Sequence, residues 1–312
     1  MSSVYLSSSE FPGIASGVAI GAFDGFHLGH QRVIGELMAR AKRASLSTVI
    51  YTFRQNPKLS THGVRGLLTT NSERVDCAGR MGVEHIVLED FSSKFQGMPP
   101  EAFVQDIVVG RLNARLVVVG SDFRFGSERA GDVDVMSRIL GQSGRTLVVM
   151  DPVMIDGEVC SSSLIRSAVA VGDVERAAQF LGRPYSIEGV IVTGNRIGGR
   201  LGFPTANIEV PDPVKLLPGN GVYAVRALVD QTSVNGVCNI GVRPTVTAGS
   251  RRTVEVHLLD FHKQVYGHLA SMEFVARLRP EIHFSSTAAL VNQISQDVAR
   301  TRALLGGSER PR

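Results

Sequence analysis

Two histidines flank a leucine and a glycine in the segment His27–Leu28–Gly29–His30. The segment lies between an apolar, β-prone stretch, residues 18–22, and a helix-like stretch, residues 31–44. A strand therefore turns into a helix here, and the free N–H groups and the dipole of a helix N-terminus attract anions. Because His27 and His30 are three residues apart, they share one face of the helix. The pattern predicts a phosphate-binding site.

The residues around these histidines support the same prediction. Gly29 leaves no side chain to block a nucleotide, and Gly21 permits the tight turn that the loop needs. Phe23 and Asp24 precede the histidines in a Gly-x-Phe-Asp-Gly run. A lone histidine is more often structural than catalytic, but two histidines after such a run are a far more specific signal.

A second glycine-rich segment, residues 194–207, ends in Pro-Thr-Ala-Asn. Hairpin turns use glycine constantly, and the Gly-Lys-Ser/Thr of a Walker A loop is absent. The backbone of Gly194 and its neighbours, together with Arg200, nevertheless forms a suitable cradle for phosphates. Thr205 and Asn207 offer the hard oxygen atoms that Mg²⁺ prefers. The segment predicts a second phosphate site, with a metal.

Residues 253–259 alternate strictly between apolar and polar side chains. Val254, Val256 and Leu258 therefore share one face of a strand, and Glu255 lies on the opposite face. A carboxylate there is able to accept a hydroxyl proton during phosphate transfer. From the strand alone, a solvated residue on an outer face is the more frequent explanation.

The pattern around these motifs indicates two domains in the 312 residues. Strand-like runs alternate with helices up to roughly residue 153, which predicts a parallel α/β sheet. After residue 185 short strands separated by Gly, Pro and Asn predict a small all-β barrel, followed by a closing helix. We expect domains at 1–185 and 186–306 and a disordered tail at 307–312. The predicted elements are strands at 48–53, 84–88, 116–119, 146–150, 187–192, 222–229, 253–259 and 272–278, and helices at 31–44, 72–81, 100–112, 163–171, 173–181 and 286–305.

The first motif resembles the HxGH nucleotidyltransferases, in the version found in bacterial FAD synthetases. In these enzymes the histidines bind ATP phosphates and stabilise the charge on the departing pyrophosphate. Residues 199–207, 239–245, 254–261 and 277–281 resemble the riboflavin kinase module, in the right order. From residue 17 to residue 305 the chain is therefore similar to the bifunctional riboflavin kinase/FMN adenylyltransferases. The fold implied is an HxGH, Rossmann-like α/β domain followed by an all-β kinase barrel with a C-terminal helix.

The resemblance implies a role for each matching residue. His27, His30 and Glu255 would be catalytic, with Glu255 the base for the riboflavin 5′-hydroxyl. Thr205 and Asn207 would hold Mg²⁺ and ATP phosphate, and the substrates would be ATP and flavins. The remaining ATP-binding residues would be Gly21, Phe23, Asp24, Gly29, Ser162, Ser163, Arg166, Gly194 and Arg200, and the flavin-binding residues Asp122, Phe123, Phe125, Arg279 and Glu281.

Simpler explanations exist for two of these groups. The aromatic residues of the 120–126 loop are suited to packing on rings, but half-buried core is their commoner role. The serines of the 161–163 run, where Ser163 replaces the family's usual Thr, would serve as helix caps in the simpler interpretation.

One loop departs from the family pattern. Phe53 is followed by Arg54–Gln55–Asn56, where the family usually has an acidic residue and a proline. The departure leaves open a kinase-only protein with a weakened N-terminal domain. A non-catalytic flavin- or RNA-binding regulator is a further alternative.

Charge and cysteine content narrow the remaining classes. Lys and Arg number 33 against 29 Asp and Glu, without a long basic run, so the surplus is weak evidence for nucleic-acid binding. The three cysteines are widely spaced, which favours a reducing cytoplasm over a disulfide framework. No apolar run is long enough to span a membrane. We expect a cytoplasmic enzyme that acts on small molecules. Whether it associates with itself is left open.

Overall fold

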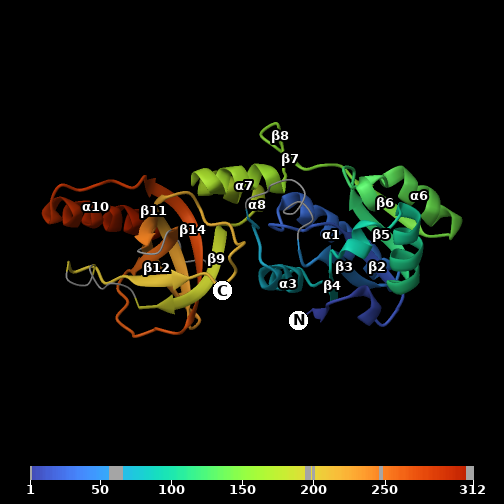
Figure 1. Ribbon diagram of the computed structural model, residues 1–312, viewed down its shortest axis with the longest axis horizontal. Helices are drawn as coiled ribbons and strands as arrows, with labels where there is room; N and C mark the ends of the chain where they lie inside the picture. The colour runs from blue at the N-terminus through green and yellow to red at the C-terminus, as the bar shows by residue number, and fades with distance from the viewer. Residues whose placement is uncertain (1, 56–65, 194–197, 199–200, 246–248, 307–312) are drawn as a thin grey trace. The chain divides into compact units, whose positions relative to one another are not determined.

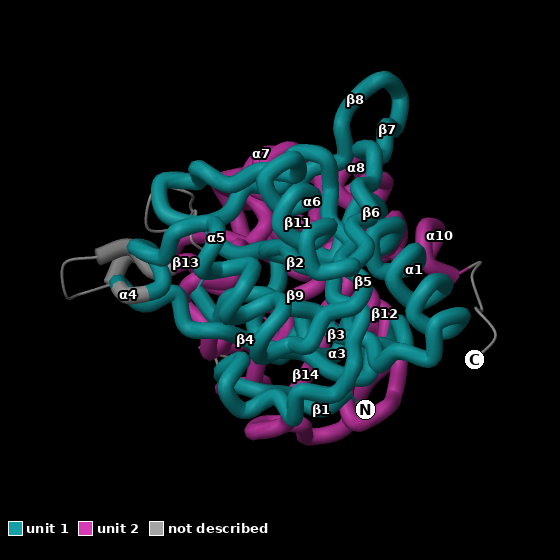
Figure 2. Tube along the Cα trace, turned by 90° about the vertical axis from the view of Figure 1, so that its right-hand side faces the viewer, with its two compact units in different colours: residues 1–162 teal, residues 163–312 magenta. Residues whose placement is uncertain are grey.

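The computed structural model describes residues 2–55, 66–193, 198, 201–245 and 249–306. The chain forms two compact units, residues 1–162 and 163–312, drawn in two colours in Figure 2. The helices α7 (Ser162–Val171) and α8 (Val174–Leu181) fall almost entirely in the second unit. The expected functional boundary after residue 185 stays a prediction, and the expected tail, 307–312, lies outside the described residues.

The first unit is built on a six-stranded parallel sheet, which confirms the predicted α/β pattern (Figure 1). The strand order is β1-β4-β3-β2-β5-β6. From β2 the chain adds β3 and β4 on one side and β5 and β6 on the other. The strands are β1 (Ser3–Tyr5), β2 (Ser16–Ile20), β3 (Ser47–Phe53), β4 (His85–Glu89), β5 (Ala114–Gly120) and β6 (Thr146–Met150).

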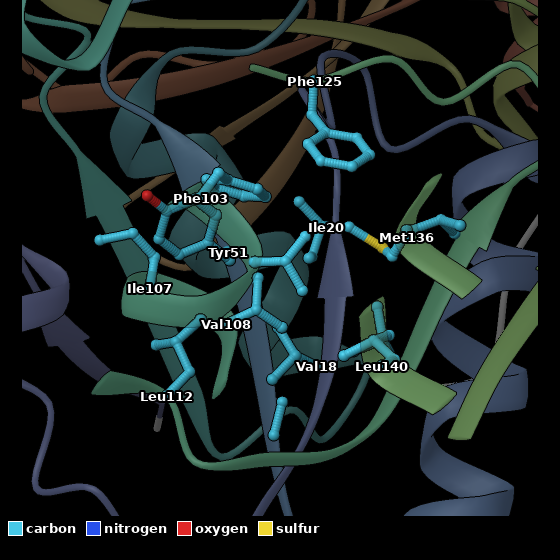
Figure 3. Packing of buried hydrophobic residues seen from close by; sticks show 14 of the residues in the cluster. Val18, Ile20, Tyr51, Phe103, Ile107, Val108, Leu112, Phe125, Met136 and Leu140 are labelled. Atoms are coloured by element: carbon cyan, nitrogen blue, oxygen red, sulfur yellow. The ribbon is translucent and has the colours of Figure 1, made fainter. Parts of the chain in front are cut away.

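Helices cover both faces of this sheet. Alternate strand residues point to opposite faces, so Ala19 and Ile50 pack against α1 (Leu28–Arg43) and α3 (Asn71–Arg80). Val18 and Tyr51 pack on the other side, against the π-helical segment η2 (Phe103–Arg111) and α6 (Val133–Gln142) (Figure 3). Short elements complete the unit: η1 (Ser8–Glu10), α4 (Ser93–Gln96), α5 (Pro100–Ala102), η3 (Ser127–Arg129) and the hairpin β7 (Met154–Ile155) and β8 (Glu158–Val159).

The second unit contains a closed antiparallel barrel of six strands, which confirms the predicted all-β module. The order around the barrel is β10-β13-β12-β11-β14-β9. The closing helix α10 (Thr287–Leu305) packs against it through Leu305 and Val298, which meet Val222, Ala224 and Val237. The strands are β9 (Tyr185–Val192), β10 (Ala206–Glu209), β11 (Gly221–Val229), β12 (Thr232–Thr245), β13 (Gly249–Leu258) and β14 (Leu269–Arg279).

Local capping sets several boundaries that the sequence pattern placed differently. The helix α1 begins at Leu28, three residues before the predicted start, because the His27 side chain caps it. Thr70 and Glu73 form a reciprocal capping box at the start of α3. The elements β1, α6, β10 and β12 were not predicted. The longest of them, β12, contains glycines, asparagines and a proline, which are residue types that are more frequent in loops than in strands.

In the described part of the chain no helix combines the length and apolar character that crossing a bilayer requires.

Candidate active sites

The first candidate site lies at the switch point of the parallel sheet. Ligands of such sheets bind at the carboxyl ends of the strands, where neighbouring connections run in opposite directions. The strands β2 and β5 are neighbours there, with Ala19 opposite Val118. The loop with the two histidines follows β2, and the 120–126 loop follows β5. The sheet therefore brings both predicted loops to the same edge.

The loop before the histidines has an unusual backbone. Phe23 and Phe26 are buried and have φ angles of 44° and 47°, in the left-handed region that non-glycine residues rarely adopt. Asp24, which is also buried, accepts hydrogen bonds from the Thr69 N–H (3.0 Å) and hydroxyl (3.3 Å). The Thr69 hydroxyl in turn accepts the N–H of Gly25 at 2.9 Å. The carboxylate of Asp24 thus holds the turn in place, and its direct contact with ATP stays a prediction.

The two histidines lie against each other at the start of α1. Their rings are stacked, with centroids 3.7 Å apart and planes inclined by 22°. The Nδ1 atom of His27 accepts the backbone N–H of His30 at 3.4 Å. A Cβ atom on Gly29 would lie only 3.1 Å from two atoms of the His27 ring. Gly29 therefore leaves the room that the His27 ring occupies, and its role towards a nucleotide stays a prediction.

The first turn of α1 is less open than its position suggests. The His30 N–H is used by His27, and the backbone N–H groups of Leu28 and Gly29 bond to the Cys160 sulfur, which limits the rise that burial causes in the pKa of that thiol. The N–H groups of this turn are therefore less available to an anion than a bare helix end would be, and phosphate binding by the histidines stays a prediction.

The serine segment approaches the same loop. The Ser162 hydroxyl donates to the Asp24 carbonyl at 2.9 Å, so Ser162 ties the segment to the histidine loop. On α7, Arg166 is buried and Ser163 is exposed. Their contacts with nucleotide stay predictions.

The loop after β5 carries stacked aromatic residues. The rings of Phe123 and Phe125 are 5.4 Å apart and nearly parallel. Phe125 is buried against Phe103, which agrees with a core role, whereas Phe123 is half-buried and Asp122 is exposed. Their contact with flavin stays a prediction.

Three half-buried phenylalanines lie beside the loop after β3, and they were not singled out from the sequence. Phe53, at the end of β3, packs edge to face on Phe91 and Phe95, with ring centroids 5.1 and 5.0 Å away. Phe53 is the last residue of an apolar strand and directly precedes the unusual loop. That position was the available signal.

An ion pair and two hydrogen bonds, all made by arginine side chains, hold the start of the loop that departs from the family pattern. Arg54 forms an ion pair with Asp90 at 2.9 Å. The buried guanidinium of Arg74 donates to the carbonyls of Phe53 (2.8 Å) and Arg54 (3.1 Å). The charge of Arg54 is thus partly offset by Asp90. Asn56 lies outside the described residues.

The second candidate site lies on the barrel, where three polar residues form a row across neighbouring strands. Asn207 of β10 pairs with Glu255 of β13, which pairs with Asn239 of β12. Directly paired residues share one face of a sheet. All three are half-buried, whereas Val254 and Val256 are fully buried on the opposite face. The predicted alternation is confirmed, and Asn239 is a neighbour of Glu255 that was not singled out.

The Pro-Thr-Ala-Asn segment is anchored to the strand that carries Glu255. The His257 Nδ1–H donates to the carbonyl of Pro204 at 2.8 Å, and the Phe203 ring packs edge-on against His257. Thr205 is half-buried next to this anchor. The other members predicted for this loop, Gly194 and Arg200, lie outside the described residues.

The two residues predicted to bind flavin at the end of β14 and just after it have clear partners. Arg279 forms a bidentate ion pair with the buried Asp297 of α10, with the closest N–O distance 2.8 Å. Glu281 accepts the Asn220 side-chain amide at 3.1 Å and fills the space beside Gly241. Arg279 thus joins α10 to the barrel, and its contact with flavin stays a prediction.

The donor atoms fit a hard cation better than a transition metal. Within the described residues no group of three or more His, Cys, Asp or Glu side chains is placed to hold a metal ion. Asn207 offers an amide oxygen next to the Glu255 carboxylate, and oxygen ligands suit Mg²⁺.

Comparisons with known proteins decide the family. A model described as FAD synthetase matches residues 14–164, and one described as riboflavin kinase matches residues 181–305. The chain is 35% identical over 289 residues to the bifunctional riboflavin kinase/FMN adenylyltransferase of Bacillus subtilis, covering 90% of this chain and 89% of that protein. The chain belongs to the bifunctional riboflavin kinase/FMN adenylyltransferase family.

Further relatives of this family extend the match. The protein of the same name from Escherichia coli (strain K12) is 32% identical over 301 residues, which cover 96% of this chain and 95% of that protein. The chain also superposes on the crystal structure of a macrolide-efflux protein from Streptococcus pneumoniae, with a TM-score of 0.88 and 28% identity, over 96% of this chain and 98% of that one. Family membership confirms the resemblance that the motifs indicated and the order of the two domains.

Proposed function

We propose that this protein makes FMN and FAD in two ATP-dependent steps. The barrel transfers the γ-phosphoryl group of ATP to the 5′-hydroxyl of riboflavin. The N-terminal α/β domain then transfers AMP from a second ATP to FMN and releases pyrophosphate. The observation that carries the proposal is that both family models match in order along one chain, each over the residues proposed to be catalytic in its domain. We assign the two activities to residues 186–306 and 1–185.

In the kinase step Glu255 is the general base. Its carboxylate takes the proton of the riboflavin hydroxyl as the oxygen attacks the γ-phosphorus. Thr205 and Asn207 would hold the Mg²⁺ ion and the ATP phosphates, and the ion would supply charge neutralisation. The register of Asn207 beside Glu255 supports this assignment, because it sets the binding residue next to the base.

In the adenylyl transfer His27 and His30 stabilise charge. A phosphate oxygen of FMN attacks the α-phosphorus of ATP, and the bond to pyrophosphate breaks without an enzyme nucleophile. The histidines act on the negative charge that develops on the departing group. Their place at a helix N-terminus adds the favourable dipole.

The other residues bind rather than react. Gly21, Phe23, Asp24 and Gly29 shape the nucleotide loop. The remaining assignments are Ser162, Ser163, Arg166, Gly194 and Arg200 for ATP phosphates, and Asp122, Phe123, Phe125, Arg279 and Glu281 for flavin.

The kinase-only alternative rests on the 54–56 loop. The ion pair between Arg54 and Asp90 weakens this alternative, because the extra positive charge is partly offset. The basic residues of the sequence are scattered without a long run, which argues against a nucleic-acid regulator. We propose a cytoplasmic location and small-molecule substrates, and we leave self-association open.

Incubation of the purified protein with riboflavin, ATP and Mg²⁺, followed by chromatography of the flavins, tests the proposal. We expect FMN to appear first and FAD afterwards. FMN without FAD, also from saturating FMN, would establish the kinase-only alternative. Neither product, together with salt-dependent binding of RNA, would favour the regulator.

A further inference from the structure

The thiol of Cys160 lies at the point where α1 begins. Its sulfur is 3.5 Å from the Nδ1 atom of His27, and both residues are buried. The backbone N–H groups of Leu28 and Gly29 also bond to this sulfur. The contact joins residues 133 positions apart in the sequence, from the loop before α7 and the cap of α1.

The hydrogen bonds around His27 define where its proton lies. The His30 backbone N–H donates to Nδ1, so Nδ1 is an acceptor and does not carry a proton. A neutral imidazole then carries its proton on Nε2. The thiol therefore also donates to Nδ1, and it shares the single lone pair of that nitrogen with the His30 N–H, so both contacts are long, 3.5 and 3.4 Å.

The state of the thiol agrees with this direction. Burial raises the pKa of Cys160 above its ordinary value, although the nearby backbone N–H groups lower it in part. Cys160 is therefore a protonated thiol at neutral pH. The protonated thiol brings an S–H donor to the contact with His27.

The geometry points to Cys160 as a positioning residue for adenylyl transfer: its thiol holds the His27 ring and, together with the His30 N–H, keeps the proton on Nε2. Which nitrogen of a histidine is protonated is set by the partner of the other nitrogen. An Nε2–H group is a hydrogen-bond donor, as an ATP phosphate requires. This inference rests on the role proposed for His27.

Three variants separate positioning from simple packing. Cys160→Val keeps an apolar side chain but removes the S–H, and Cys160→Ser keeps a donor. Cys77→Ser alters another buried thiol of the same unit, on α3, and serves as the matched control. His27→Ala tests the underlying assignment. The riboflavin kinase activity of the same preparations reports on folding and concentration.

We expect Cys160→Val to lower FAD formation about 10- to 100-fold, the scale of a misplaced catalytic group. Cys160→Ser should retain most of the rate, and Cys77→Ser should match the parent. Long-range ¹H–¹⁵N spectra of the protein labelled at histidine should show His27 protonated on Nε2 in the parent. Cys160→Val should show a larger fraction of the Nδ1–H tautomer, because only the 3.4 Å bond from the His30 N–H then holds Nδ1 as an acceptor.

The outcomes distinguish a failure of the role inferred for Cys160 from a failure of the role proposed for His27. An unchanged FAD rate and His27 spectrum in Cys160→Val, with His27→Ala inactive in adenylyl transfer, would overturn the positioning role alone. A parent spectrum with the proton on Nδ1 would overturn it as well. A fully active His27→Ala would instead remove the proposed function of His27, on which the inference rests.

Discussion

The imidazole rings of His27 and His30 stack with centroids 3.7 Å apart at the N-terminus of α1. Two positive charges at this distance would repel each other, and the helix dipole would add to the cost. The acceptor role of the His27 Nδ1 agrees with an uncharged ring on that side of the pair. We propose that the ring N–H groups of the pair donate to the negative charge that develops during the reaction.

Replacing one member of the pair should separate the two activities. We expect His30→Ala to lower FAD formation by roughly 10²–10³-fold, the effect of losing one preorganised donor, and to leave FMN formation largely intact. Parallel assays with FMN and with riboflavin measure the two steps. Equal loss of both would contradict the assignment of the histidines to one domain.

Gly29 tests how tightly the loop is built. In Gly29→Ala the new Cβ would lie 3.1 Å from the His27 ring, so the ring must shift, and FAD formation should fall about 10-fold. Gly35→Ala is the control on the same helix, because nothing lies within 4 Å of its Cβ position. It should leave the FAD rate unchanged and stabilise the helix by about 0.5–1 kcal/mol. Equal rates in the two variants would show that the ring tolerates displacement.

Glu255→Gln keeps the shape of the side chain and removes the base. Riboflavin phosphorylation should fall roughly 10²–10⁴-fold, while conversion of FMN to FAD persists. Glu273→Gln, on β14 of the same barrel, removes a half-exposed partner of Arg226 and should have little effect on either rate. A Glu255→Gln protein that makes FMN at the parental rate would mean that Glu255 is only a solvated surface residue.

Two ion pairs of α10 provide a stability test. Asp297 is buried against Arg279, so Asp297→Ala leaves an unpaired buried charge and should reduce the free energy of unfolding of the barrel by about 3–5 kcal/mol. Asp260 pairs with Arg302 at the surface, and Asp260→Ala should change the free energy of unfolding of the barrel by about 1 kcal/mol or less. Hydrogen exchange of barrel peptides measures both. Similar protection in the two variants would mean that α10 is held by its apolar contacts instead.

Tyr223 should make the barrel sensitive to alkaline pH. Burial raises the pKa of this phenol from 10.0 to about 12. Between pH 10 and 12 the folded protein keeps this proton, whereas the unfolded chain has lost it. The contribution of Tyr223 to the free energy of unfolding is therefore fully present below pH 10 and is lost as the pH rises towards 12. Thermal unfolding of the parent and of Tyr223→Phe between pH 8 and about 12 checks this. The variant should lose less stability over that range, and identical slopes would contradict the prediction.

Local pattern determined much of the fold. The alternation of apolar strands and amphipathic helices predicted the parallel sheet, and the alternation around Glu255 predicted its face, since both depend on the repeat of side-chain direction along one element. The motifs around His27 and Asn207 predicted both sites because their residue types and spacing are rare together. Elements without such a pattern, above all β12, were missed.

The sequence by itself determined the two-domain order, the family and the identity of the motif residues. Only the tertiary structure decided which hydrogen-bond and ion-pair partners these residues and their neighbours have. The contact of Cys160 with His27, the bond of Thr69 to Asp24 and the pairing of Asp297 with Arg279 join residues that lie far apart along the chain or on separate elements. No local pattern records such pairings, because they arise where strand order and helix packing close the chain on itself.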